Sequence, residues 1–422
     1  MNIRGVEITY KHLGVLLIVW LAFGLSFVDR LAWPPIMPVA MKEMGMTATQ
    51  AGSYMTIFYV GYVLTQLPGG LLNDRYGYRK VLLFSFLFMG CFTILMGTIQ
   101  SYEQGLIYRF LAGVGSGAVF SAGIKAVFDW FPAKGRGTAL GFFSTANTFG
   151  VALANLMIPL VARSYSWHMA FFVTGSITLI TLLSAFFLLC ERQGPGQAVH
   201  DQAEPGRFWL DLLSLLKNRN LIMTGVIGCG LMWATIGTTA WVNTYINKVL
   251  QLSLVETGAI VSLFGICGFI AKPLGGILCD YFQGKNAAII FGCFMAFGIL
   301  LIVFGINTSV SMLYVLVPLL GVSAFLVSPA LDTAVGEAVP RHLVGTAVGF
   351  ANTLWQVGSI TAPLAVGAVV DATHNYTYVF MVLAVGPIAG ALLAPLLKLK
   401  PNNAAENGSY APQPASKGGR ME

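Results

Sequence analysis

Long apolar segments alternate with short polar segments along almost the whole chain. Each apolar run approaches or exceeds the roughly 20 residues that an α-helix needs to cross about 30 Å of hydrocarbon. The pattern predicts twelve such helices, at 13–40, 50–72, 80–99, 104–131, 137–162, 167–190, 221–247, 256–281, 285–306, 311–337, 344–369 and 376–398. We therefore expect an all-α integral membrane protein in a lipid bilayer, without an extramembrane segment large enough for a soluble catalytic domain.

Two of the polar segments carry nearly the same motif. The first reads Gly70-x-Leu72-x-Asp74-Arg75-x-Gly77-x-Arg79-Lys80, and the second reads Gly276-x-Leu278-x-Asp280-x-x-x-Gly284-Lys285. Paired halves in a membrane chain are typical of transporters that rock one half against the other around a site between them. The expected domains are six-helix bundles at 1–190 and 221–400, a cytoplasmic linker at 191–220 and a disordered cytoplasmic tail at 401–422.

The basic residues predict the orientation. With the N-terminus inside the cell, most of the 24 Lys and Arg residues fall in segments that would be cytoplasmic. Both termini are therefore expected in the cytoplasm, and the membrane is expected to be the plasma membrane, or the inner membrane of a bacterium. The net charge of +7 reflects this bias, and the basic residues form no patch suited to nucleic acid.

The cysteines and histidines indicate neither a metal site nor an enzyme. The six cysteines lie in or at the ends of apolar spans without metal-ligand spacing, so we expect no disulfide, metal or cofactor. The five histidines map to loops or span edges, and the acids inside spans are too few for paired acid–base catalysis.

Charged residues inside the predicted spans are the main functional signal. Four bases lie there, Arg30, Arg109, Lys125 and Lys272, whereas the only deep acid is Asp29. A charge at the bilayer centre costs roughly 2.5–3.5 kcal/mol on insertion scales, so each needs a partner or a function. A cavity with surplus positive charge favours an anion, because the ligand supplies the missing counter-charge.

Several strings resemble a known family. The duplicated loop motif and Arg109-x-x-x-Gly113-x-Gly115 are similar to motifs of the major facilitator superfamily. More narrowly, three pieces resemble the anion:cation symporter family of organic-anion carriers: Asp29-Arg30, the helix 2 string Tyr62-x-x-x-Gln66-x-Pro68-x-Gly70, and Lys125-x-x-x-x-Trp130-Phe131-Pro132. The resemblance covers all twelve spans and implies the major facilitator fold, with two pseudo-symmetric six-helix bundles.

The resemblance also implies roles for single residues. Arg30 would hold the substrate carboxylate, Asp29 would take part in proton coupling, and Tyr62 and Gln66 would line the same cavity. The planar guanidinium of arginine suits bidentate binding of a carboxylate. Asp29 and Arg30 could instead merely neutralise charge, but adjacent helical positions project about 100° apart and do not face each other.

The string Ala271-Lys272-Pro273 is a separate signal. It resembles the Ala-Arg-Pro of helix 8 in monocarboxylate transporters, where the arginine receives the substrate carboxylate. The repeat places Lys272 opposite Gln66, so both halves would present polar groups to one cavity. Gly268 stands where those transporters have an aspartate, so Lys272 is either neutral or awaits an anion, and we favour the anion.

Two further groups of polar residues are candidates. Asn147, Tyr245, Asn352 and Gln356 are expected to orient ligand hydroxyls or to tie helices together. Gating is expected near the cytoplasmic face, where Asp129 would meet Arg75 or Arg79. The full gating set is Asp74, Arg75, Arg79, Asp129, Asp280 and Glu337. Arg109 is expected to brace its helix.

One position departs from proton-coupled relatives, many of which have a helix 4 glutamate where this chain has Ser116. Asp29 is then the only deep acid, and the coupling ion is a proton or sodium. We expect a monomeric secondary active transporter that imports a small organic anion, a sugar acid or other hydroxylated carboxylate, by proton symport and alternating access. The alternatives are a monocarboxylate or aromatic-acid carrier, a drug/proton antiporter and a non-transporting sensor.

Overall fold

The computed structural model describes residues 2–3, 6–7, 10–189, 215–282, 284–340 and 343–397. Helices dominate these ranges, and a short antiparallel pair, β1 (Asn2–Ile3) and β2 (Val6–Glu7), precedes them. The N-terminal half contains α1 (Tyr10–Arg30), α2 (Met37–Met44), α3 (Ala48–Tyr76), α4 (Tyr78–Met96), α5 (Tyr102–Ser116), α6 (Val119–Trp130), α7 (Ala133–Ser144), α8 (Ala146–Ser164) and α9 (Trp167–Leu188). The C-terminal half contains α11 (Arg219–Val249), α12 (Leu254–Tyr281), α13 (Asn286–Ile306), α14 (Val310–Leu326), α15 (Ser328–Glu337), α16 (Val344–Thr373), α17 (Thr377–Leu393) and η2 (Ala394–Leu396).

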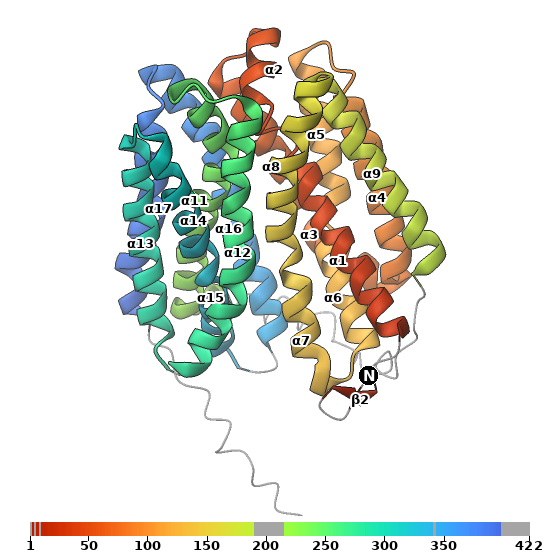
Figure 1. Ribbon diagram of the computed structural model, residues 1–422. Coiled ribbons are helices and arrows are strands. Elements are labelled where there is room, and N and C mark those ends of the chain that lie inside the picture. Colours follow the sequence, from red (N-terminus) through yellow and green to blue (C-terminus); the bar gives the residue numbers. More distant parts are fainter. Residues whose placement is uncertain are drawn as a thin grey trace, which may run out of the picture.

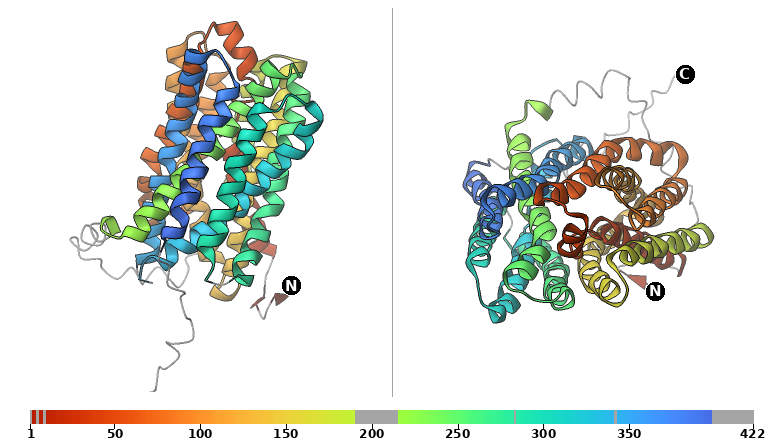
Figure 2. Two further views of the ribbon diagram at one scale, coloured as in Figure 1. Left: turned by 90° about the vertical axis from the view of Figure 1, so that its left-hand side faces the viewer. Right: turned by 90° about the horizontal axis from the view of Figure 1, so that it is seen from above.

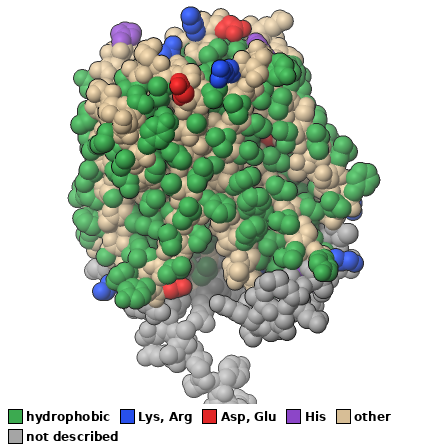
Figure 3. Space-filling model, viewed as in Figure 1, with side chains coloured by type: hydrophobic (Ala, Val, Ile, Leu, Met, Phe, Trp, Pro, Cys, Tyr) green, Lys and Arg blue, Asp and Glu red, His purple; other side chains and the backbone are tan. Residues whose placement is uncertain are grey.

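Twelve spans in the described ranges are long and apolar enough to cross a membrane, which confirms the predicted class. Three of them are built from two consecutive helices, α5 with α6, α7 with α8, and α14 with α15. Apolar side chains cover the middle of the molecule, and the visible charged side chains gather toward its two ends (Figure 3). The predicted linker at 191–220 lies mainly outside the described residues, and the predicted tail at 401–422 lies wholly outside them.

The first span is shorter than predicted. The sequence pattern suggests apolar structure over 13–40, but α1 ends at Arg30 and the chain turns before α2. Pro34 and Pro35 lack backbone N–H groups and their rings clash with the preceding helical turn, so the helix cannot continue. As a result, Asp29 and Arg30 lie in the last turn of α1.

The duplicated motif forms the same kind of turn in both halves. Gly77 separates α3 from α4 with φ of 86°, and Gly284 lies between α12 and α13 with φ of 75°. A side chain at such a backbone conformation is strained, which explains why glycine stands in both copies.

The two halves pack against each other through two helix pairs, α3 with α16 and α8 with α12 (Figures 1 and 2). Near the end that carries α2, the backbones approach so closely that a Cβ atom on Gly52 would collide with the Pro363 carbonyl group. The Thr56 hydroxyl also donates across this seam to the Ile360 carbonyl oxygen at 2.7 Å. The halves are therefore in tight contact at the α2 end.

Candidate functional site

A central cavity of ≈ 220 Å³ lies between the two halves. Its lining comes from α1, α3, α6, α7 and α8 on one side and from α11, α12, α14, α15 and α16 on the other. The charged residues of this lining are Arg30, Lys272 and Asp332. Two bases and one acid leave a surplus positive charge when all three are ionised, which favours an anionic ligand.

The Arg30 side chain is buried, only 3% exposed, and has no carboxylate partner among the described residues. Its guanidinium carbon lies 4.2 Å from the centre of the Phe27 ring and 4.3 Å from that of Tyr62. One terminal nitrogen donates a long hydrogen bond, 3.4 Å, to the Ser116 hydroxyl, and Nε has no partner. Ser116 is neutral, whereas a glutamate at this position, as in many proton-coupled relatives, would neutralise Arg30.

Arg109 holds the end of α1 in place. Its guanidinium donates to the backbone carbonyl oxygens of Asp29 at 3.1 Å and Arg30 at 2.8 Å. These carbonyl groups lie at the end of α1, where the Asp29 oxygen also accepts from the Ala32 N–H group at 3.3 Å. Arg109 is fully packed and also lies over the Phe58 ring at 4.7 Å, so its contacts fit a bracing role rather than ligand binding.

Asp29 points away from the central cavity, into the N-terminal half. Its side chain is completely buried, and one carboxylate oxygen accepts a short hydrogen bond from the Thr178 hydroxyl of α9. The Thr93 hydroxyl of α4 also lies beside this carboxylate. Asp29 and Arg30 therefore face different surroundings, as the 100° offset of adjacent helical positions predicts.

Lys272 reaches across the seam from the C-terminal half. Its ammonium donates to the Ser144 carbonyl oxygen and to the Asn147 side-chain oxygen, both at 3.0 Å. The Ser144 carbonyl group is available because α7 ends there before α8 begins. Asp332 of α15 lies close enough for its charge to act on Lys272, although the two form no direct ion pair.

Several polar atoms that line the central cavity lack any hydrogen-bond partner in the described residues. They are Arg30 Nε, Thr235 Oγ1, Gln356 Oε1 and Ser359 Oγ, and the Tyr59 hydroxyl lies beside the Arg30 guanidinium. Leaving a buried polar group unpaired costs roughly 1–3 kcal/mol, so such a cluster indicates a surface made for a polar ligand. Sequence reasoning missed Tyr59, Thr235, Ser359 and Asp332; Tyr59, one turn before Tyr62, was the one that helical spacing could have suggested.

The other expected binding residues lie in three different places. Tyr62, Asn147, Asn352 and Gln356 line the central cavity. Gln66 instead lines the neighbouring cavity described below, one turn along α3 from Tyr62. Tyr245 lies elsewhere, where its hydroxyl contacts the backbone carbonyl oxygens of Phe304, Gly305 and Asn307 at 3.0–3.3 Å. Its contacts tie α11 to the end of α13.

A second cavity of ≈ 540 Å³, here called the entry cavity, lies between the halves toward the end opposite α2. Phe120 and Asn352 line both cavities, so the two are neighbours along the seam. Asp74 and Lys125 border the entry cavity and form an ion pair at 2.6 Å, with Asp74 half exposed. Both residues belong to the N-terminal half, so this ion pair does not close the seam.

The remaining gating candidates also make their observed contacts within their own halves. Arg79 donates to the Phe186 carbonyl oxygen at 2.6 Å, and Arg75 lies over the Tyr76 ring at 5.3 Å. Glu337 accepts from the Asn286 amide at 3.2 Å, which joins α15 to the start of α13. Asp129 lines the entry cavity, and Asp280 is an exposed carboxylate near the end of α12.

The opposite end is closed by a carboxylate latch. Asp371 of α16 accepts hydrogen bonds from the backbone N–H groups of Ala48 and Thr49, each at 2.8 Å. These are free donors in the first turn of α3, where a negative charge is also favoured by the helix dipole. The latch crosses the seam between the halves, so it must break if this end opens.

We expect Asp371→Asn to loosen the α2 end without unfolding the protein. Losing a helix cap costs about 0.5–2 kcal/mol, so hydrogen exchange of the first amides of α3 should become about tenfold faster. Exchange measured by mass spectrometry tests this, with Glu103→Gln, at an exposed acid in the first turn of α5, as the control. Unchanged exchange in Asp371→Asn would contradict the latch.

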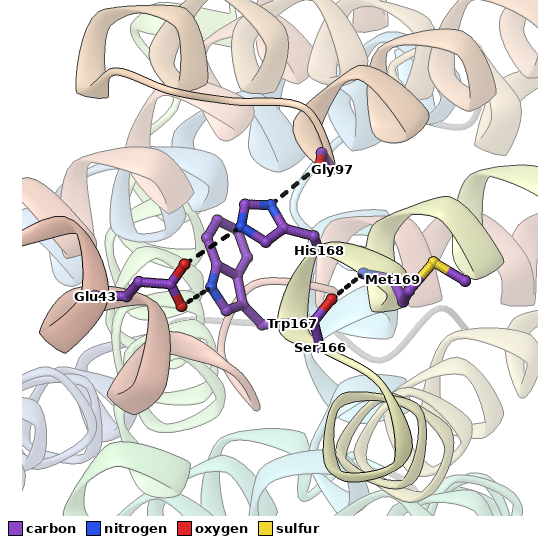
Figure 4. A network of polar contacts seen from close by, with 6 residues as sticks. All are labelled: Glu43, Gly97, Ser166, Trp167, His168 and Met169. Carbon is purple, nitrogen blue, oxygen red and sulfur yellow. Dashed lines mark hydrogen bonds and ion pairs between the residues drawn. The ribbon is translucent and has the colours of Figure 1, made fainter.

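A further hollow of ≈ 500 Å³ lies at the α2 end, and residues of the N-terminal half alone line it. Figure 4 shows its polar network: Glu43 accepts from the Trp167 indole at 2.8 Å and lies 3.5 Å from the His168 imidazole. His168 also contacts the Gly97 carbonyl oxygen at 3.0 Å. These contacts tie α2 to α9 and to the end of α4, and the hollow does not touch the seam.

Two membrane-embedded halves around one polar cavity define a membrane transport protein. The family model described as Major Facilitator Superfamily matches residues 19–363, and the chain belongs to that superfamily. This confirms the predicted fold and the prediction that the protein is a transporter rather than an enzyme.

Curated relatives match over nearly the whole chain. A protein of Bacillus subtilis (strain 168) named "Probable galactarate/D-glucarate transporter GudP" is 26% identical over 92% of this chain and 91% of its own length. The "Hexuronate transporter" of the same organism is 24% identical over 96% of this chain and 98% of its own. Both belong to the anion:cation symporter family, which agrees with the predicted resemblance.

The fold is also shared with a solved structure. The bacterial homologue of the human lysosomal transporter Spinster, in an inward-facing and unoccupied conformation, aligns with a TM-score of 0.73 at 14% identity. The alignment covers 93% of this chain and 96% of that chain.

Proposed function

We propose that the protein is a secondary active transporter that imports a small hydroxylated organic anion, such as a sugar acid, through the central cavity. The observation that carries the proposal is Arg30, a buried guanidinium without a carboxylate partner that lines the cavity together with unpaired polar atoms. A carboxylate would neutralise Arg30, and ligand hydroxyls would pair with Gln356, Ser359 and Thr235. The names of the relatives, transporters of aldarates and hexuronates, support this substrate class.

The aromatic lining of the cavity favours a second substrate class, the aromatic monocarboxylates. Phe23, Phe27, Phe120, Phe325 and Trp355 line it beside the two tyrosines. The flat face of an aromatic acid would stack on such rings, whereas the unpaired hydroxyls and amide would stay unsatisfied. The sugar acid satisfies both the charge and the unpaired groups, so it is our first choice.

The test is a thermal-shift screen of purified protein followed by uptake into reconstituted vesicles. A ligand that binds only the folded state raises the apparent stability by RT ln(1 + [L]/Kd), about 2.7 kcal/mol at 100 times Kd. Sugar acids should raise the melting temperature, and their uncharged sugar alcohols should not. Stabilisation by aromatic acids alone would favour the second class, and binding without uptake would indicate a sensor.

The proposed orientation places the N-terminus in the cytoplasm. The entry cavity then opens toward the cytoplasm, and the latched α2 end faces outside. Alternating access would close the entry cavity and open the latch, so the present arrangement corresponds to an inward-facing state. The proposed membrane is the plasma membrane, or the inner membrane of a bacterium, and the proposed transporting unit is the monomer.

Asp29 is proposed as the proton-coupling group. Its carboxylate lies beside the Thr178 and Thr93 hydroxyls and forms no ion pair in the described structure. It is also joined through the backbone of α1 to Arg30, the substrate-binding group, and Arg109 fixes both carbonyl groups. A proton at Asp29 can therefore influence the α1 end that presents Arg30 to the ligand.

We propose that Asp74 and its repeat counterpart Asp280 take part in gating the entry side. In the present state Asp74 pairs with Lys125 beside an open cavity, and closure would bring other partners toward it. Asp74→Asn should slow transport several-fold and change the conformational balance, with ligand affinity within about twofold of the wild type. Equilibrium binding and vesicle uptake measure the two effects separately. A large loss of affinity at normal transport rates would place Asp74 in the binding site instead.

A further inference from the structure

The central cavity contains a second basic side chain besides Arg30, the residue proposed to bind the ligand carboxylate. Arg30 belongs to α1 of the N-terminal half, whereas Lys272 belongs to α12 of the C-terminal half, and both line the same cavity. Arg30 lies among aromatic rings, and Lys272 lies beside Asn147 and the Ser144 carbonyl group. Two cations supplied by opposite halves can hold two anionic groups of one ligand.

Asp332 is the acid that competes for Lys272. α15 begins at Ser328, which also lines the cavity, and Asp332 follows one turn later. Its carboxylate forms no ion pair with the described residues, and it lines the same cavity as the Lys272 side chain. The helices packed against α15 are α11, α12, α13, α14 and α16, and the charged residue on them that lines the central cavity is Lys272.

We propose that Lys272 is a second anion subsite for a ligand with acidic groups at both ends, and that it becomes available when Asp332 binds a proton. This inference rests on the proposed function, because Arg30 must hold the first carboxylate. With Asp332 ionised, the three charges sum to +1 and match a monoanion. With Asp332 protonated they sum to +2 and match a dianion, and the proton ends on the Asp332 carboxyl oxygen.

The arrangement also explains why Lys272 has so few partners. The ammonium has three N–H groups, of which two donate to Ser144 and Asn147. One donor is left for an anion in the cavity. In the empty carrier the nearby Asp332 supplies the counter-charge across a gap, and a ligand carboxylate can replace it without breaking a direct ion pair.

The test compares a six-carbon polyhydroxy diacid with the aldonic acid that has the same hydroxyls and one carboxylate. Binding to the purified full-length protein is measured by calorimetry at pH 5.5 and pH 7.5. The diacid should bind at least tenfold more tightly than the monoacid at pH 5.5, with a smaller advantage at pH 7.5. Both ligands stay ionised over this range, since ordinary carboxyl groups titrate near pH 4.

Three variants separate the roles of the two residues. Lys272→Gln should abolish the diacid advantage, whereas Lys272→Arg should retain it. Asp332→Asn should keep the full advantage at both pH values, because no carboxylate then competes for Lys272. Equal affinities for the two acids in the wild type would overturn the inference alone, and so would a diacid advantage in Asp332→Asn that still falls at pH 7.5. Failure of both acids to bind would overturn the proposed function as well.

Discussion

Replacing Arg30 with lysine is expected to weaken binding of the organic anion by about 100-fold while the protein still folds and inserts. Lysine keeps the charge but loses the planar pair of donors that holds both oxygens of a carboxylate. A hydrogen bond to a charged group typically contributes about 1.5–3 kcal/mol, which covers this range. A substitution here is expected to have a large effect on binding, because Arg30 is 3% exposed and lies between the Phe27 and Tyr62 rings.

The Arg30 experiment combines equilibrium binding with uptake into vesicles. Arg163→Lys is a suitable control because this arginine lies exposed in the last turn of α8, away from the central cavity. The control should bind and transport like the wild type. Arg30→Ala should lose binding further, and its melting temperature without ligand shows that the fold is intact. Near-normal affinity in Arg30→Ala would exclude the carboxylate from this position.

The fold could be predicted almost completely from the sequence. Apolar runs of sufficient length leave few alternatives in a bilayer, because backbone groups must be paired internally and helices do this locally. The duplicated motif added the two-fold organisation, and both copies turn at a glycine, Gly77 or Gly284, with positive φ. The one visible error in span length came from reading through Pro34-Pro35.

Part of the cavity lining was predicted from the sequence. Polar residues that stand out within one apolar span could be found, whereas contacts between distant segments could not. Arg30, Tyr62, Asn147, Lys272, Asn352 and Gln356 line the central cavity, and each is a conspicuous polar or basic residue in an apolar span. Asp332 was missed by sequence reasoning, and it lines the cavity from α15, which follows the break at the end of α14. Contacts between distant segments, such as Asp74 with Lys125 and Asp371 with Ala48, leave no local signal.

Ser116 shows how a sequence departure gains meaning from the structure. The sequence alone shows that a helix 4 carboxylate is missing, which leaves Asp29 as the deep acid of the N-terminal half. The structure shows the Ser116 hydroxyl within 3.4 Å of Arg30, so the missing acid would have lain beside the proposed ligand-binding guanidinium. The chain therefore keeps Arg30 unneutralised and separates it from Asp29, which lies on the other side of α1 against Thr178.

Asp29→Asn is expected to abolish accumulation of substrate driven by an inward proton gradient, while exchange of internal for external substrate continues at near wild-type rates. Asparagine preserves the size of the side chain and can still bond to Thr178, but it cannot take up or release a proton. Exchange needs only the loaded carrier to change state, whereas net uptake requires the empty carrier to return after losing its proton. Vesicles with a pH gradient, compared with vesicles preloaded with substrate, measure the two modes in one preparation. Glu103→Gln, at an exposed acid in the first turn of α5, serves as the carboxyl-to-amide control and should retain accumulation. If Asp29→Asn still concentrates a monoacid with the proton gradient as the sole driving force, the coupling proton travels on another group, and Asp29 serves only to join α1 to α9.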